Sequence, residues 1–289
     1  MINRLTIIGV GLIGGSLARA LRQARVCREI VGCGRELASL RQAQALGVID
    51  RIELDPGAAV MGADMVVVAV PLGAMESVFR AIAPHVGADA VITDVGSAKA
   101  SVIGAARRGF GTMPAQLVLG HPIAGTERSG VEASYAELFA HRKVILTPLQ
   151  QTARSAVERV RDMWQATGAQ VVEMSVEHHD KILAATSHLP HMLAYTLVDT
   201  LARMGEHDEI FSYAAGGFRD FTRIASSDPQ MWHDICLSNR EALLAMLDLF
   251  IQDLGRLREA VGNNDSAYLL TLFQRAKQAR DHFAQQFKA

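Results

Sequence analysis

The chain has 289 residues, which is long enough for two domains. Hydrophobic residues make up 49% of it and charged residues only 20%, a composition that predicts a large buried core and excludes a disordered protein. The formal net charge of −1 argues against a nucleic-acid partner and an anionic membrane surface, and the apolar run at 65–71 is too short to span a bilayer.

Cysteine usage and the first residues predict a reduced, cytoplasmic protein. The three cysteines, Cys27, Cys33 and Cys236, are odd in number and show no CxxC spacing. A strand that starts near Leu5 leaves no room for a signal peptide.

Short apolar runs alternate with helical patterns in the first half of the chain. We predict strands over 5–8, 29–33, 65–70, 90–94, 117–119, 144–147 and 170–173. After the first strand, four apolar residues recur with the spacing of one helix face: Ile13, Leu17, Leu21 and Ala24. Strands interleaved with helices predict right-handed βαβ units and a mostly parallel sheet. We therefore expect an α/β Rossmann-type domain over residues 1–173.

The second half carries helical periodicity only. We place a domain boundary between residues 173 and 174 and expect an all-α domain over 174–289. The last helix is expected to reach about Phe287.

One long helical segment in this half is unusually apolar. Asp228 and Pro229 are typical of a helix start, and Gly262 is typical of a helix end. Between them lies an apolar stripe that widens to a second side, formed by Leu243, Leu244, Leu247, Phe250, Ile251, Leu254 and Leu257. Such a helix must be covered on more than one side. Helices of the same domain or a dimer interface can provide the second cover, and we predict a homodimer through the helical domain.

Three glycines between the first predicted strand and the first predicted helix match the dinucleotide fingerprint GxGxxG. Gly9 permits the tight turn, Gly11 lets the backbone approach a pyrophosphate, and Gly14 allows close contact between helix and strand. Backbone N–H groups at the start of the helix then hold the anion. Because the motif follows a strand and opens a helix, we interpret it as an NAD or NADP site. The predicted cofactor-binding residues are Gly9, Gly11, Leu12, Ile13, Gly14, Gly34, Arg35, Val70, Pro71 and Asp94.

The position that contacts the adenosine ribose leaves the choice of cofactor open. A carboxylate is expected there when the 2′-hydroxyl of NAD is bound, but this chain has Gly34 followed by Arg35. That arrangement removes repulsion against a 2′-phosphate and supplies a cation, which favours tolerance of NADP. Glu36 can still reach a 2′-hydroxyl if the turn is loose.

Two polar residues follow predicted strands and are candidates for chemistry. His121 comes after the strand at 117–119, where an open sheet presents a side chain to a ligand, and its imidazole titrates near neutral pH. The alternative interpretation is a histidine satisfied in the interior. Ser97 follows the strand at 90–94, where it is expected to cap the next helix and can also donate a hydrogen bond into the site.

Helical segments add further candidates. His188 and His191 lie three residues apart around a proline, but no HExxH or paired-cysteine spacing accompanies them, so no metal site is predicted. Arg223 either serves the site or pairs with Asp220 in its own turn. The segment 178–180 is interpreted as a solvated helix start.

Together these segments resemble the prephenate/arogenate (cyclohexadienyl) dehydrogenase family, NAD(P)-dependent enzymes of tyrosine biosynthesis. The resemblance covers nearly the whole chain, and the segments HPIAGTE at 121–127 and GGFRDFTRIA at 216–225 carry it most specifically. It implies oxidative decarboxylation of prephenate to 4-hydroxyphenylpyruvate, of arogenate to tyrosine, or of both.

The resemblance also implies roles for individual residues. His121 would draw the proton from the C4 hydroxyl of the ring as hydride leaves for the nicotinamide, and Ser97 would help to hold that hydroxyl. Arg223 would bind a substrate carboxylate as a planar, two-pronged donor. The other implied substrate-binding residues are four that line the pocket (Thr126, Glu127, His188 and His191) and three near its mouth that a dimer partner can contribute (Arg219, Asp220 and Trp232).

Two further functions share the broad pattern. A β-hydroxyacid dehydrogenase also has a Rossmann domain followed by helices, but Lys181 lacks the glycine-rich framing expected of its catalytic lysine. A nicotinamide-sensing regulator without turnover would not need the polar cluster of Ser97, His121 and Arg223. The sequence shows neither a chorismate mutase domain nor an ACT domain, so any feedback by tyrosine is expected at the active site itself.

Overall fold

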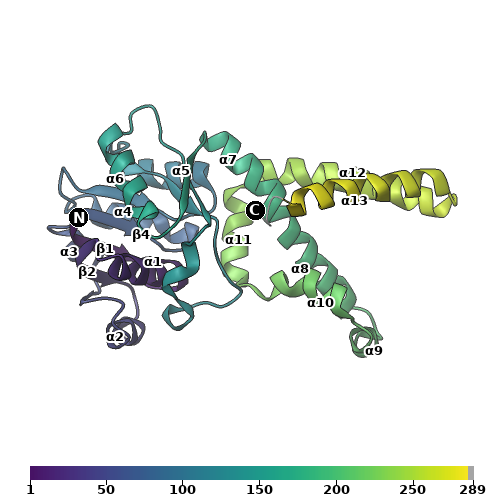
Figure 1. The fold of residues 1–289 in the computed structure, drawn as a ribbon, viewed down its shortest axis with the longest axis horizontal. Coiled ribbons are helices and arrows are strands. Elements are labelled where there is room, and N and C mark those ends of the chain that lie inside the picture. The colour runs from purple at the N-terminus through teal and green to yellow at the C-terminus, as the bar shows by residue number, and fades with distance from the viewer. Residues whose placement is uncertain (286–289) are drawn as a thin grey trace. The chain divides into compact units, whose positions relative to one another are not determined.

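Parallel strands form the larger of two sheets in the computed structural model, which describes residues 1–285 (Figure 1). Its strands lie in the order β3-β2-β1-β4-β5-β6, and each neighbouring pair is parallel. They are β1 (Ile2–Ile8), β2 (Cys27–Cys33), β3 (Arg51–Glu53), β4 (Met65–Val68), β5 (Val91–Asp94) and β6 (Leu117–Val118). The chain order reverses between β1 and β4, and in such sheets ligands bind beyond the carboxyl ends of the strands at this point. The predicted α/β Rossmann-type fold is confirmed.

A second sheet carries His121. It consists of β7 (Gly120–Pro122), β8 (Lys143–Leu146) and β9 (Gln170–Glu173), with β7 antiparallel to β8 and β8 parallel to β9. The sequence pattern predicts a single series of strands, whereas β8 and β9 pair with β7 because the chain leaves the larger sheet at Leu119. His121 pairs with Ile145 of β8, so it lies within a strand rather than after one. Just before it, the carbonyl of Leu119 accepts a hydrogen bond from the amide of Thr147 (2.9 Å).

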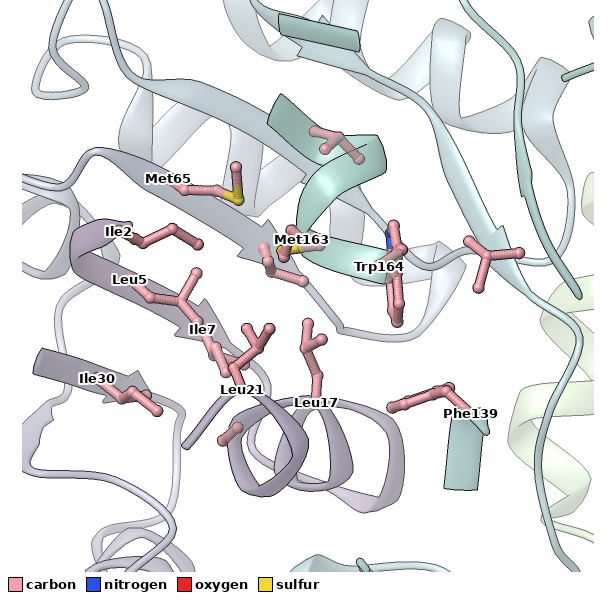
Figure 2. Packing of buried hydrophobic residues seen from close by; sticks show 14 of the residues in the cluster. Ile2, Leu5, Ile7, Leu17, Leu21, Ile30, Met65, Phe139, Met163 and Trp164 are labelled. Carbon is pink, nitrogen blue, oxygen red and sulfur yellow. The ribbon is translucent and has the colours of Figure 1, made fainter. Parts of the chain in front are cut away.

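Helices cover both faces of the larger sheet, because side chains alternate along each strand. On one face, β1 and β4 pack against α1 (Leu12–Gln23) and α6 (Arg154–Gln165). Figure 2 shows Leu17 and Leu21 of α1 facing β1, with Trp164 of α6 beside them. The opposite face packs against α3 (Pro56–Val60), α4 (Met75–Ile82) and α5 (Lys99–Phe110), while α2 (Leu37–Ala45) follows β2. Ala24, expected on the buried face of α1, lies at its C-cap and is exposed.

After β9 the described residues contain no strand. Their helices are α7 (Val176–Leu183), α8 (Leu189–Ala202), α9 (His207–Ser212), α10 (Gly216–Thr222), α11 (Pro229–Ser238), α12 (Arg240–Gly262) and α13 (Ser266–Gln285). Short 3₁₀ turns lie at η1 (Leu72–Ala74), η2 (Val131–Ala133), η3 (Ala136–Phe139) and η5 (Arg223–Ser226). No helix within residues 1–285 is long and apolar enough to cross a membrane. The helix end expected near Phe287 lies outside the described residues.

Two irregularities interrupt the helical part. A π turn, η4 (Ala184–His188), joins α7 to α8 just before Pro190, which has no N–H to offer an α-helical ladder. The segment 229–262, expected as one helix, breaks at Asn239 between α11 and α12. The side chain of Asn239 is buried and donates to the carbonyl of Asp180 (2.8 Å), so a tertiary contact replaces helix continuity there.

The chain divides into two compact units, Met1–Ala242 and a second that begins at Leu243. This division lies within α12. The domain boundary at 173/174 stays a prediction, based on the end of strand content at Glu173.

We predict that Leu17→Ala destabilises the first unit by about 2–5 kcal/mol, because Leu17 is fully buried in the core between α1 and β1. The matched control, Leu46→Ala, removes a side chain that is 45% exposed and should cost less than about 1 kcal/mol. Urea denaturation followed by tryptophan fluorescence measures both. Equal shifts in the two variants would contradict the placement of Leu17.

Candidate active site

The glycine loop forms an open cradle at the reversal point of the larger sheet. Gly9 has φ +99°, and a Cβ there would lie 2.3 Å from the carbonyl oxygen of Ala69. A Cβ on Gly14 would lie 2.2 Å from the carbonyl oxygen of Gly9, whereas one on Gly11 would meet nothing within 4 Å. No side chain caps α1 at Gly11, so the first N–H groups of the helix face this open space. The cradle therefore fits a pyrophosphate held by backbone and helix dipole.

The other predicted cofactor residues lie at the carboxyl ends of neighbouring strands. Gly34 and the exposed Arg35 follow β2, and Arg35 makes no ion pair with any described residue. Val70 and Pro71 lie just beyond the end of β4. The residue between them and the strand, Ala69, still pairs with β1, because its amide donates to the carbonyl of Ile8 (2.7 Å). This placement is what a dinucleotide lying across β1, β2 and β4 requires.

A buried ion pair fixes the start of β7. The Lys99 ammonium donates to Asp94 Oδ2 (2.7 Å) and to the carbonyl of Gly120 (2.6 Å), and both charged side chains are fully buried. Asp94 Oδ1 accepts from the amide of Gly120 (3.2 Å). Both backbone groups of Gly120 are thereby held, which places His121 next to the carboxyl end of β5. Asp94, predicted at the cofactor, is engaged in this clamp.

His121 begins a chain of three hydrogen-bonded side chains. Its Nδ1 lies 2.9 Å from His179 Nε2, and His179 Nδ1 lies 2.7 Å from Asp180 Oδ1. His179 is fully buried and Asp180 is 6% exposed, so the interpretation of 178–180 as a solvated helix start is wrong for these two residues. Of these three residues only His178 is exposed, because the opposite face of α7 packs against α5.

Asp180 also caps helix α5. Its two carboxylate oxygens accept from the amides of Lys99 (2.8 Å) and Ala100 (2.9 Å). The expected cap by Ser97 is wrong: α5 begins at Lys99, and its N-cap is Ala98 without a side-chain hydrogen bond. The hydroxyl of Ser97 makes no hydrogen bond to another described residue, which leaves it free to serve a ligand.

The electrostatics of the cluster favour a neutral His121. Burial lowers its pKa well below 6.5, and the nearby Lys99, His179 and His188 lower it further. Burial alone would raise the pKa of Asp180, but the hydrogen bonds from His179 and from the backbone N–H groups of α5 outweigh it and the pKa is lowered. The cluster thus holds an uncharged imidazole at one end and a carboxylate at the other.

A second group of rings lies on α8 and α11. His191 stacks on Trp232 with ring centroids 3.7 Å apart, and His188 meets the same ring edge-on at 6.1 Å. His188 is 1% exposed and Trp232 is 6% exposed, so Trp232 is buried and not at a pocket mouth. Burial lowers the pKa of His188 to about 4. Asn239 donates to His188 Nδ1 (3.1 Å), whereas His188 Nε2 and Trp232 Nε1 are buried without a partner among residues 1–285.

The remaining candidates lie on exposed segments. Arg223 pairs with Glu127 (3.0 Å), so its expected alternative partner, Asp220, is not its partner here. Asp220 instead lies 3.8 Å from Arg219, and the side chains of both are exposed (79% for Asp220 and 82% for Arg219). Thr126 Oγ1 accepts from the amide of Arg128 (3.2 Å) within the loop after β7. The structure brings Glu127 and Arg223 together, but it does not bring Arg219 or Asp220 to His121.

Sequence reasoning missed His179, Asp180, Lys99 and Asn239. One signal was present, because a carboxylate often accepts from a histidine ring nitrogen and fixes the tautomer, and Asp180 directly follows His179. The partners of Lys99 and Asn239 lie at least five residues away or on other elements, so no local pattern marks them. No group of three or more His, Cys, Asp or Glu suited to a metal occurs within the described part of the chain.

Comparison with known proteins identifies the family. A model of the prephenate dehydrogenase nucleotide-binding domain matches residues 17–173, and a model of the prephenate dehydrogenase dimerization domain matches residues 175–275. The chain belongs to the prephenate dehydrogenase family. It is 41% identical over 283 residues to the cyclohexadienyl dehydrogenase of Zymomonas mobilis, covering 96% of this chain and 95% of that protein. It is 37% identical over 290 residues to the prephenate dehydrogenase of Bacillus subtilis, covering 97% and 76%.

Solved structures agree with this assignment. The prephenate dehydrogenase from A. aeolicus, in complex with hydroxyphenyl propionate and NAD+, superposes with a TM-score of 0.91 at 35% identity, over 98% of this chain and 99% of that one. The Synechocystis arogenate dehydrogenase superposes with a TM-score of 0.79 at 26% identity, over 97% and 99%. The predicted family and activity class are confirmed: this is an NAD(P)-dependent oxidoreductase of the prephenate/arogenate type.

We predict that alanine at two glycines of the cradle affects two different properties, cofactor affinity at Gly11 and stability at Gly14. Gly11→Ala should leave the melting temperature near that of the wild type but raise Kd for NAD+ about tenfold or more, because its methyl group enters the space for the pyrophosphate. Gly14→Ala should cost about 1–3 kcal/mol of stability, because its methyl group meets the backbone of Gly9. Calorimetric titration and thermal denaturation measure the pair. Normal NAD+ binding by Gly11→Ala would show that the cofactor lies elsewhere.

Proposed function

We propose that His121 is the general base in the oxidative decarboxylation of prephenate, arogenate or both. The observation that carries this role is a half-buried imidazole held beside the carboxyl edge of the sheet by a buried polar network, where burial lowers its pKa and so favours the neutral form. A neutral imidazole can accept the proton of the C4 hydroxyl of the substrate. Ser97, whose hydroxyl is not used within the described part of the protein, can hold the same hydroxyl group.

The cofactor supplies the hydride acceptor. NAD or NADP fits the cradle of Gly9, Gly11 and Gly14, with Leu12 and Ile13 offering backbone N–H groups at the start of α1. When bound, the nicotinamide would supply the acceptor for the hydride that leaves C4 of the substrate ring. The substrate loses its hydroxyl proton to His121 as the hydride leaves C4. Departure of CO₂ from the ring carboxylate then leaves an aromatic phenolate, which takes the proton back from His121 to give the phenol. The aromatic product makes the step effectively irreversible.

Substrate recognition is assigned to the groups around Arg223 and Trp232. Arg223 presents a planar guanidinium that suits a carboxylate, and its present partner, Glu127, lies on the loop that follows His121. Buried ring nitrogens of His188 and Trp232 lack partners within residues 1–285, and an unpaired buried polar group costs about 1–3 kcal/mol unless a ligand or water satisfies it. His191 and Thr126 complete the proposed lining. Arg219 and Asp220 reach the site only from a second subunit.

A homodimer in the cytoplasm completes the proposal. On α12, Leu244, Ile251 and Leu254 are 45%, 62% and 51% exposed, and a second copy would cover them. The match to a dimerization-domain model supports this arrangement. The three free cysteines support a reducing compartment. Gly34 and Arg35 at the ribose position support use of NADP beside NAD.

We predict turnover in at least one of four mixtures, combining prephenate or arogenate with NAD+ or NADP+. His121→Asn should lower kcat by about 10²–10⁴, the usual contribution of a positioned base, while Kd for the cofactor stays within about threefold. Absorbance of the reduced nicotinamide measures turnover. No signal in any mixture, or an unchanged kcat in His121→Asn, would count against the proposal.

We predict that the acidic limb of the kcat–pH profile lies below pH 6.5. The base must be unprotonated, so activity falls as the pH drops through the pKa of His121, which burial, Lys99, His179 and His188 place well below 6.5. Rates measured between about pH 5 and pH 8 test this. His121→Asn should lack the limb. A midpoint at or above pH 6.5 in the wild type would contradict a neutral, buried His121.

A further inference from the structure

The proton positions in the chain from Asp180 to His121 follow from its hydrogen bonds. The carboxylate of Asp180 can only accept, and it already accepts from the backbone amides of Lys99 and Ala100. His179 Nδ1, at 2.7 Å from Asp180 Oδ1, must therefore donate. A neutral imidazole carries one proton, so His179 Nε2 is an acceptor.

The same reasoning fixes the tautomer of His121. Its Nδ1 lies 2.9 Å from the acceptor His179 Nε2, so Nδ1 carries the proton and Nε2 carries a lone pair. His121 Nε2 has no partner within residues 1–285 and is not among the buried polar atoms left without one, so it faces accessible space. The accessible nitrogen is thus the basic one.

We infer that His179 and Asp180 are positioning residues, which hold His121 in the tautomer that presents the Nε2 lone pair to the substrate hydroxyl. This inference rests on the proposed role of His121 as the base. Without His179, the two neutral tautomers of His121 would compete, and the one with its proton on Nε2 cannot accept a proton from the substrate.

The surroundings leave the two positioning residues little freedom. His179 is fully buried, and Asp180 is held by the first two amides of α5. The carbonyl of Asp180 accepts from the side chain of Asn239 (2.8 Å), so its backbone is fixed as well. On the opposite side, Lys99 and Asp94 clamp Gly120 next to His121. Both ends of this hydrogen-bonded series, Asp180 and His121, are therefore anchored to rigid elements.

Charge supports the same role. When His121 accepts a proton it becomes a cation in a site that already contains the Lys99 ammonium. The Asp180 carboxylate, linked through His179, offsets this charge. Loss of the link should therefore lower kcat more than it changes KM or cofactor binding, because the charge forms only as the reaction proceeds.

Two substitutions of His179 and one matched control separate positioning from structural support. His179→Phe keeps a ring of similar size but removes the acceptor for His121 Nδ1, and we expect kcat to fall about tenfold to hundredfold with KM within about threefold. His179→Gln restores an amide oxygen near the position of Nε2 and should recover most of the loss. His178→Gln alters the exposed neighbour on the same helix and should match the wild type.

Nitrogen NMR of the imidazole rings tests the tautomer without any turnover. In the free enzyme, His121 should show a protonated Nδ1 and an unprotonated Nε2, with its signals identified by their loss in His121→Asn. In His179→Phe the two nitrogens should shift toward mixed tautomers. This readout stands even if no substrate mixture gives turnover, so failure of the proposed function and failure of this inference are distinguishable.

Three results would overturn the inference. These are a wild-type His121 with its proton on Nε2, an unchanged kcat in His179→Phe, or a loss in His179→Phe that His179→Gln does not recover although both variants fold. Thermal denaturation of each variant establishes that the compared proteins are folded.

Discussion

The buried ion pair between Lys99 and Asp94 connects the cofactor-binding sheet to the strand that carries His121. Placing two charges in the interior carries a desolvation cost of several kcal/mol for each ion, which good geometry must offset. Here Lys99 has two acceptors, and Asp94 receives hydrogen bonds from Lys99 and from the amides of Gly96 and Gly120. Removing one partner would leave an unpaired buried charge and typically costs about 3–5 kcal/mol. The contact that orders the site is therefore also one on which the fold depends.

Three parts of the chain contribute to one cluster. The larger sheet provides the cradle and Asp94, the smaller sheet provides His121, and α7 provides His179 and Asp180. Helix α5 links them, because its first residue, Lys99, contacts both sheets with its side chain and Asp180 with its amide. The N-terminus of α5 thus has two roles: it joins the parts of the fold, and it places the charges of Lys99 and Asp180 at the site.

Local sequence patterns predict the features that neighbouring residues determine. The glycine spacing at 9, 11 and 14 and the apolar runs of β1 and β4 depend on short-range physics, and they are sufficient to predict the Rossmann fold. His121 is predictable for the same reason, through its place beside a strand. Its partner His179 is 58 positions away, and its burial depends on the packing of α7 against α5, which no short pattern encodes. The second sheet and the break at Asn239 likewise result from tertiary contacts that override the local preference.

The π turn before Pro190 changes which residues share a side of the helix. In an unbroken α-helix, Asp180 and His188 would lie about 80° apart around the axis, since each residue turns about 100°. One extra residue absorbed by the wider turn reduces this to about 20°, so the side chain of Asn239 can contact both the carbonyl of Asp180 and the ring of His188. The site therefore depends on the angular position of these residues around the helix axis. A one-residue deletion within 184–187 would rotate His188 and the rest of α8 by a quarter turn or more, so the length of this stretch matters to the site independently of its residue types.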